Sequence, residues 1–141
     1  MRRETFFNAG KLIVVEATIV GPRGTTSARM LLDTGATITT VVPEILALVG
    51  YNPRDGARRT RVRSAVGEEH GYELALTAFT ALGFTLDGHL VNVFDLGHED
   101  IADGLIGMNF LNQFNYEIRS AEGRILVETI AAKAPDGRDN P

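Results

Sequence analysis

The chain has 141 residues, which suits one domain with its own core and is too short for two ordinary domains. Apolar residues make up 44% and charged residues 23%, which excludes a globally disordered chain. The net charge of -4 gives no general case for nucleic-acid binding, and the lack of cysteine excludes disulfides and a cysteine nucleophile. No apolar run is long enough to span a membrane, so we expect a cytoplasmic protein with no membrane span.

Strand patterns dominate the first part of the chain. Residues 11–20 (KLIVVEATIV) are apolar and β-branched, and the turn sequence GPRG follows at 21–24. Residues 27–32 (SARMLL) then read as the returning strand. Residues 43–50 (PEILALVG) predict a short helix, because Pro43 suits a first helical turn and the apolar residues share one face.

The middle of the chain predicts a hairpin, more strand and a second short helix. Residues 59–82 read as a hairpin with its tip near Gly67, followed by a long strand. Residues 84–96 alternate between apolar and polar and then become apolar, which favours a strand. Residues 103–114 (DGLIGMNFLNQF) look like a strand end, a glycine and a helix that begins near Asn109.

The last part of the chain predicts a terminal hairpin and a tail. Residues 115–130 contain two strand patterns that turn at Glu122 and Gly123. The segment after Ala132 has almost no apolar content, so we expect a disordered tail at 133–141. The chain is therefore expected to be mostly β with one or two short helices, in a single domain over residues 1–132.

Asp33 stands in an unusual place, directly after two leucines in the run MLLDTGATITTVV at 30–42. A carboxylate among apolar residues costs free energy unless something satisfies it or uses it. One reading is a structural turn, because Asp-Thr-Gly is good turn chemistry. The other is a catalytic acid on a loop that Gly35 lets approach another backbone closely.

Two close carboxylates can hydrolyse an amide, because they share one proton. The ionised acid takes a proton from water, and the protonated acid polarises the carbonyl group. This chain has only one Asp-Thr-Gly. A symmetric homodimer resolves the shortage by placing Asp33 beside its own copy.

The ordered motifs LLDTGAT, ILALVG, SAVGE and DGLIGMNFL resemble those of the retropepsin-like aspartic proteases, and most closely their bacterial members. The resemblance runs from about Leu12 to Val127. It implies a closed, homodimeric retropepsin-like β-barrel that cleaves peptide bonds in peptide or protein substrates. It implies neither a metal nor an organic cofactor.

The resemblance assigns roles to individual residues. Asp33 matches the catalytic acid, Thr34 a hydroxyl that braces the dimer, and Gly35 the close-approach glycine. The flap that covers substrate matches residues 64–70. The expected substrate-contacting residues lie in the loop, the flap tip and the late apolar segment: Ala36, Thr37, Ala65, Val66, Gly67, Leu105 and Ile106.

The chain departs from the retroviral pattern in two places. Retroviral members often pair an acid two residues after the Asp-Thr-Gly glycine with an arginine after the late glycine. Thr37 and Met108 occupy these positions here, so both halves of the ion pair are absent. The flap also lacks an obvious tyrosine.

Other charged segments have simpler readings. The segment 95–100 (DLGHED) reads as a solvated loop rather than a metal site, and His70 and His89 are expected at the surface or in the flap. The arginine-rich run 54–63 reads as a solvated basic loop, or as a surface that favours acidic substrate residues. A catalytically silent dimerisation or peptide-binding domain is the alternative function.

Overall fold

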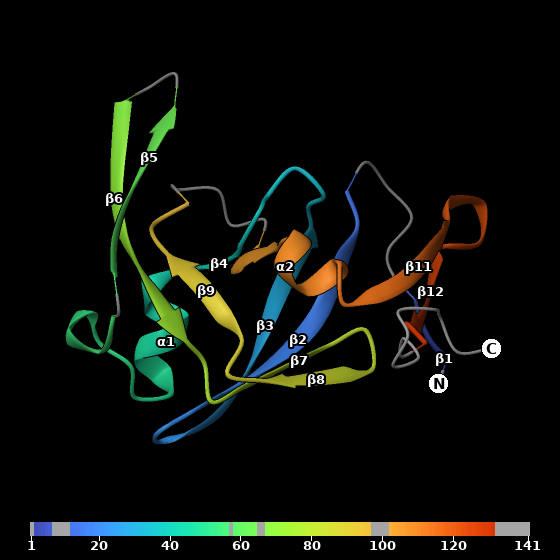
Figure 1. Cartoon of the computed structure of the whole chain (residues 1–141), viewed down its shortest axis with the longest axis horizontal. Coiled ribbons are helices and arrows are strands. Elements are labelled where there is room, and N and C mark those ends of the chain that lie inside the picture. Colours follow the sequence, from blue (N-terminus) through green and yellow to red (C-terminus); the bar gives the residue numbers. More distant parts are fainter. Residues whose placement is uncertain (1, 7–11, 57, 65–66, 97–101, 132–141) are drawn as a thin grey trace, which may run out of the picture.

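The computed structural model describes residues 2–6, 12–56, 58–64, 67–96 and 102–131 (Figure 1). This part is mostly strand, with two short α-helices, α1 (Pro43–Leu48) and α2 (Met108–Leu111). Two 3-10 turns are η1 (Pro53–Asp55) and η2 (Ser120–Glu122). The expected mostly β class with short helices is confirmed. The expected tail at 133–141 lies outside the described residues.

Nine strands form one large sheet in the order β5-β6-β9-β4-β10-β3-β2-β7-β8. In chain order these strands are β2 (Val14–Gly21), β3 (Gly24–Leu32), β4 (Thr39–Val41), β5 (Arg58–Ser64), β6 (Gly67–Ala75), β7 (Ala78–Ala81), β8 (Phe84–Asp87), β9 (Leu90–Val93) and β10 (Gly104–Ile106). Two pairings are parallel, β10 with β3 and β4 with β9. They bring distant parts of the chain together around the segment after β3.

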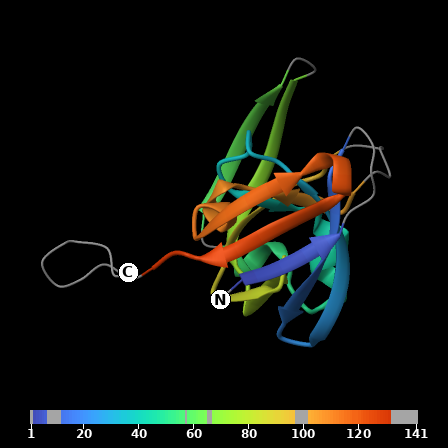
Figure 2. The same cartoon turned by 90° about the vertical axis from the view of Figure 1, so that its right-hand side faces the viewer.

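A second sheet has three antiparallel strands, β1 (Arg2–Phe6), β12 (Arg124–Thr129) and β11 (Phe114–Arg119). Figure 2 shows this sheet on the side that faces the viewer. β12 is the central strand, and an exposed ion pair of 2.8 Å joins Arg124 on β12 to Glu4 on β1. The sequence reading missed β1, whose residues are mostly polar.

The predicted local elements formed where the turn chemistry was clear. β2 and β3 pair from Val14↔Leu31 to Gly21↔Gly24, so the GPRG turn closes a tight hairpin. The predicted long strand after the β5–β6 hairpin is broken between Ala75 and Ala78. The predicted strand at 84–96 is broken at Gly88, where a φ of 65° turns the chain between β8 and β9.

One apolar core serves both sheets. Its large, fully buried side chains come from strands of both sheets and from both helices, and they include Ile19, Met30, Leu46, Phe79, Ile106, Phe110 and Ile125. They belong to a single hydrophobic cluster, to which strands of both sheets contribute. No helix in the described ranges is long and apolar enough to cross a membrane.

Candidate active site

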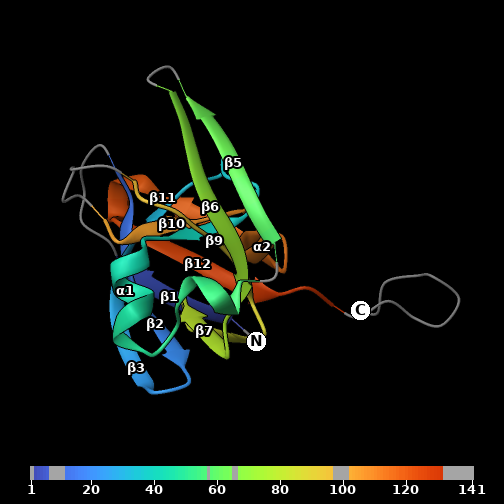
Figure 3. The ribbon, with the colours of Figure 1, turned by 90° about the vertical axis from the view of Figure 1, so that its left-hand side faces the viewer.

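The segment that carries Asp33 joins β3 to β4 and is held from behind by β10. β10 lies between these two strands, parallel to β3 at Ile106↔Leu32 and antiparallel to β4 at Leu105↔Thr40. Figures 1 and 3 show the β5–β6 hairpin extending from the body on the side that carries this loop. The loop is therefore anchored by paired strands and lies on the side of the molecule from which the hairpin projects.

Backbone hydrogen bonds fix the direction of the Asp33 side chain. The Gly35 N–H donates to Asp33 Oδ1 at 2.8 Å, and the Asp33 N–H donates to the Ile106 carbonyl at 3.0 Å. A donated N–H stabilises the ionised carboxylate. Asp33 is half-buried, whereas Thr34 and Gly35 are exposed. The loop thus presents an oriented carboxylate with an exposed surface beside it, which is what a general acid or base requires.

The second half of the loop, residues 36–38, is called the far arm here; backbone hydrogen bonds join it to the start of α2. The Met108 N–H donates to the Ala36 carbonyl at 2.7 Å, and the Asn109 N–H donates to the Thr37 carbonyl at 3.0 Å. These are two of the N–H groups that a helix start leaves without a partner inside the helix. The backbone therefore joins the segments that carry Thr37 and Met108, whose side chains lack the retroviral ion pair.

Gly107 makes this close packing possible. A Cβ at this position would lie 2.6 Å from the Ile38 carbonyl carbon and 2.7 Å from the Thr39 nitrogen. These are backbone atoms that cannot move aside cheaply. Gly107, the late glycine of the sequence motif, is thus required for the chain between β10 and α2 to pack this closely against the far arm.

A buried polar cluster lies next to this arm, and the sequence reading missed it. Thr39 Oγ1 lies 2.9 Å from Asn109 Oδ1 and 3.0 Å from His89 Nε2. His89 is only 6% exposed, so its expected surface or flap position is wrong. Two sequence features could have indicated this cluster: Thr39 lies within the run TITTVV, and His89 directly precedes the apolar run LVNV.

The expected substrate-contacting residues divide into three groups. Ala36 and Thr37 lie on the Asp33 loop, and Leu105 on β10 is half-buried. Ile106 is fully buried in the core under the loop, so its side chain is not exposed to contact a substrate as expected. The flap-tip pair at 65–66 lies outside the described residues, and Gly67 begins β6.

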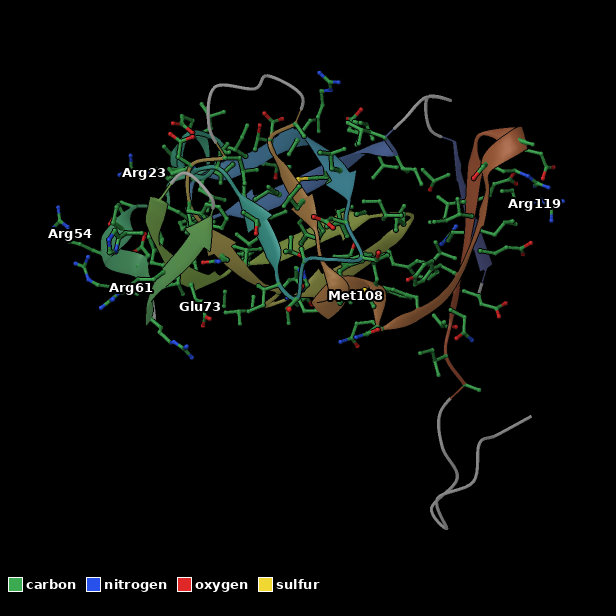
Figure 4. All side chains as sticks on the ribbon, turned by 90° about the horizontal axis from the view of Figure 1, so that it is seen from above. Arg23, Arg54, Arg61, Glu73, Met108 and Arg119 are labelled. Carbon is green, nitrogen blue, oxygen red and sulfur yellow. The ribbon has the colours of Figure 1, made fainter. Side chains whose placement is uncertain are left out.

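The arginine-rich run lies along β5 and the turn before it, at the end of the molecule opposite Arg119 (Figure 4). Arg54, Arg58 and Arg59 line a shallow hollow together with Tyr72. Burial raises the pKa of Tyr72, and the Asp55 carboxylate adds to the rise. The hollow lies at the base of the β5–β6 hairpin.

The described residues contain no group of three histidine, cysteine or acidic side chains placed to hold a metal ion. The acidic segment 95–100 is only partly covered, because residues 97–100 lie outside the described ranges. The described loop offers the Asp33 carboxylate and the backbone groups that orient it.

Comparison with known proteins agrees with this geometry. A sequence profile of a family described as aspartyl protease matches residues 15–110. A search of curated proteins gave no match. Among solved structures, the chain is similar to a retropepsin-like aspartic protease from Rickettsia conorii, with 18% sequence identity, a TM-score of 0.68, and coverage of 90% of this chain and 89% of that one. The profile matches well over half of the chain, which therefore belongs to the aspartyl protease family and has a retropepsin-like fold.

Proposed function

We propose that the protein is a homodimeric aspartic endopeptidase in which Asp33 and its copy from a second chain form the catalytic dyad. The observation that carries the proposal is the half-buried Asp33 carboxylate, oriented by the Gly35 N–H on a loop that paired strands anchor. Each chain supplies one Asp-Thr-Gly, so two chains supply the two acids that peptide hydrolysis needs.

The dyad works with one shared proton. The ionised carboxylate takes a proton from water as the water oxygen attacks the carbonyl carbon of the substrate, and the protonated carboxyl gives its proton to the carbonyl oxygen. The carboxyl that took the proton from water then gives it to the leaving nitrogen as the C–N bond breaks. A hydroxyl proton of the tetrahedral intermediate passes to the other carboxylate, so the dyad again shares one proton. The Gly35 N–H holds the Asp33 carboxyl group in one direction, so little reorganisation is needed during the reaction.

The other residues of the loop and the hairpin have supporting roles in this proposal. The exposed Thr34 hydroxyl braces one loop against its copy, and the small Gly35 lets the two loops approach. An extended peptide lies between the loop and the β5–β6 hairpin. It contacts Ala36, Thr37 and Leu105, together with the flap residues 65–67 expected from the sequence, and is held by main-chain hydrogen bonds and apolar contacts.

The replacement Asp33→Asn tests the proposal. Asparagine keeps an oxygen that accepts the Gly35 N–H, so the fold is retained, but it cannot take a proton from water. We expect peptide cleavage to fall by several orders of magnitude with no loss of thermal stability. Asp87→Asn, at an exposed end of β8, is the matched control and leaves cleavage unchanged.

A transition-state mimic separates the enzyme from the alternative, a peptide-binding domain without turnover. A statine-type peptide should bind far more tightly than the substrate peptide of the same sequence, because only a competent dyad recognises the tetrahedral centre. Equal binding of both peptides with no cleavage by the wild type would favour the binding domain. Cleavage by folded Asp33→Asn would place the chemistry elsewhere.

A further inference from the structure

His89 is a buried titratable residue that the proposed peptide hydrolysis does not use directly. Its ring is stacked on Phe79 with 5.2 Å between the ring centroids, and the edge-to-face contact with Phe110 measures 5.7 Å. The side chain reaches into the core from the start of β9 and meets Thr39, which is fully buried on β4. Aromatic packing thus fixes the imidazole where it meets the frame of the Asp33 loop.

The hydrogen bonds around Thr39 determine which nitrogen of the neutral His89 ring carries the proton. The Asn109 side-chain nitrogen donates to the Leu90 carbonyl at 2.7 Å, so its oxygen faces Thr39 and accepts from the Thr39 N–H at 2.8 Å. The Thr39 hydroxyl must use its one proton toward the same oxygen, because that oxygen has none to donate. His89 Nε2 therefore carries the proton and donates to Thr39 Oγ1.

The hydrogen-bonding capacity of the Thr39 hydroxyl is then fully used, because it donates one hydrogen bond and accepts two. Its second accepted bond comes from the Gly107 N–H at 3.2 Å. Gly107 and Asn109 flank Met108, and the N–H groups of Met108 and Asn109 hold the carbonyls of Ala36 and Thr37. One hydroxyl thus connects His89 to both backbone bonds that fix the far arm of the catalytic loop.

We propose that His89 is a positioning residue for the Asp33 loop, acting through Thr39 and Asn109, and that its protonation sets the lower pH limit of the active site. The proposal deepens the proposed peptidase function and rests on it for its effect on catalysis. The link between His89 and the loop stands on the hydrogen bonds alone.

Protonation of His89 would place a charge between two aromatic rings. The contacts to His89 come from Phe79 on β7, Phe110 on α2 and Thr39 on β4, and none of these groups is charged. Burial alone lowers the pKa of His89 to about 4. Below that pH the charged ring is driven toward water, the Thr39 hydroxyl loses a donor, and the far arm loosens. Activity should therefore have an acid limit separate from the proton requirement of the dyad.

Two replacements of His89 separate hydrogen bonding from titration. His89→Gln keeps an N–H donor at nearly the reach of Nε2 and does not titrate, whereas His89→Leu keeps apolar volume and has no donor. We expect His89→Leu to lower kcat roughly ten- to hundredfold at neutral pH with KM little changed, and His89→Gln to retain kcat within about threefold. His89→Gln should also extend activity to lower pH. Thr85→Val, which removes a hydroxyl pair on β7–β8, is the control for general destabilisation and leaves kcat unchanged.

Amide NMR tests the coupling without relying on peptidase activity. The spectra are recorded on the Asp33→Asn protein, so that the catalytic carboxyl contributes no titration. The Ala36, Thr37 and Gly107 signals should follow the titration of the His89 ring, and should lose this transition in Asp33→Asn combined with His89→Gln. Absence of cleavage in the wild type, with this coupling intact, would reject the peptidase and keep the positioning role.

Loop signals that ignore the His89 titration would overturn the proposal. The same conclusion would follow if His89→Leu cleaved peptides with the wild-type kcat and pH profile. If His89→Leu fails to fold, the pH profile of His89→Gln and the NMR titration still decide the question.

Discussion

Gly35 lies within the Asp33 loop and Gly107 packs against it, and the two are glycines for different reasons. A Cβ on Gly107 would meet backbone atoms of Ile38 and Thr39 at 2.6 and 2.7 Å. A Cβ on Gly35 would meet only Asp33 Oδ1, at 3.1 Å. The first glycine is required for the frame to close, and the second leaves the carboxylate undisturbed and the loop surface small.

The two alanine replacements should therefore separate stability from activity. We expect Gly107→Ala to lower the free energy of unfolding by about 2 kcal/mol or more, because backbone must shift to admit the methyl group. Gly35→Ala should change stability by less than about 0.5 kcal/mol but lower kcat/KM roughly tenfold or more, because it displaces the reacting carboxylate. Chemical unfolding and peptide cleavage measure both effects. Equal destabilisation by the two replacements would contradict this assignment.

At the scale of secondary-structure elements, three very short ones hold the loop. β4 and β10 have three residues each and α2 has four, too few to be stable alone. Their stability comes from burial: β4 is wholly buried, and Phe110 and Leu111 of α2 lie in the core. His89 packs against β4 and α2, so its charge state should affect the stability of the whole domain.

The pH dependence of stability follows from the lowered pKa of His89. The pKa is about 4 in the folded protein and about 6.5 in an unfolded chain. Between these values the unfolded chain binds a proton that the folded protein does not. The free energy of unfolding therefore falls as the pH drops from 6.5 to 4, by about 3 kcal/mol in total.

Denaturant unfolding at pH 7 and pH 4 should show this loss in the wild type. His89→Gln removes the titrating group, so over the same range it should lose about 3 kcal/mol less than the wild type, even if it is less stable at pH 7. Both proteins share every other titrating group, so their difference isolates His89. Parallel pH curves would show that His89 is not buried as a neutral ring in solution.

Elements with local signals were predictable from the sequence, and elements defined by distant partners were not. The β2–β3 hairpin and α1 carry their own turn, proline and apolar patterns. β1 has a mostly polar sequence and forms against β12, in a backbone register that sets Arg2 opposite Glu128. β4 has only three residues and is a strand because β9 and β10 flank it. A local sequence pattern contains no information about pairing between strands that are far apart in the chain.

The candidate site shows the same division between motif and context. The sequence motifs predicted Asp33 and the two glycines as candidates, because each stands in a short contiguous run of characteristic residues. It did not identify Thr39 or His89, which are 50 residues apart and meet only after β4, β9 and α2 have packed together. The sequence also placed Ile106 on the substrate surface, whereas its side chain is fully buried under the loop.

At the scale of the whole molecule, the two sheets limit how a second chain can pair. β12 lies between β1 and β11, so both of its hydrogen-bonding edges are occupied within the chain. A partner strand could extend this sheet only at β1 or β11. The loop between β3 and β4 lies on the side from which the β5–β6 hairpin projects (Figure 1), and Thr34 and Gly35 within it are exposed. A homodimer that brings two Asp33 loops together must therefore form its interface on that side, whether or not a partner strand also extends the three-stranded sheet.

Mixing active and inactive chains tests whether one site needs two chains. Asp33→Asn chains should exchange into wild-type dimers and give mixed dimers with a single catalytic acid. With a roughly tenfold excess of Asp33→Asn, the activity per wild-type chain should fall about tenfold once exchange is complete. Asp87→Asn chains, which keep the acid, should cause no such loss. Dilution of the wild type alone should lower activity faster than linearly, because dissociation leaves half a site. Activity that is strictly linear on dilution and indifferent to excess Asp33→Asn would mean that a single chain carries the complete site.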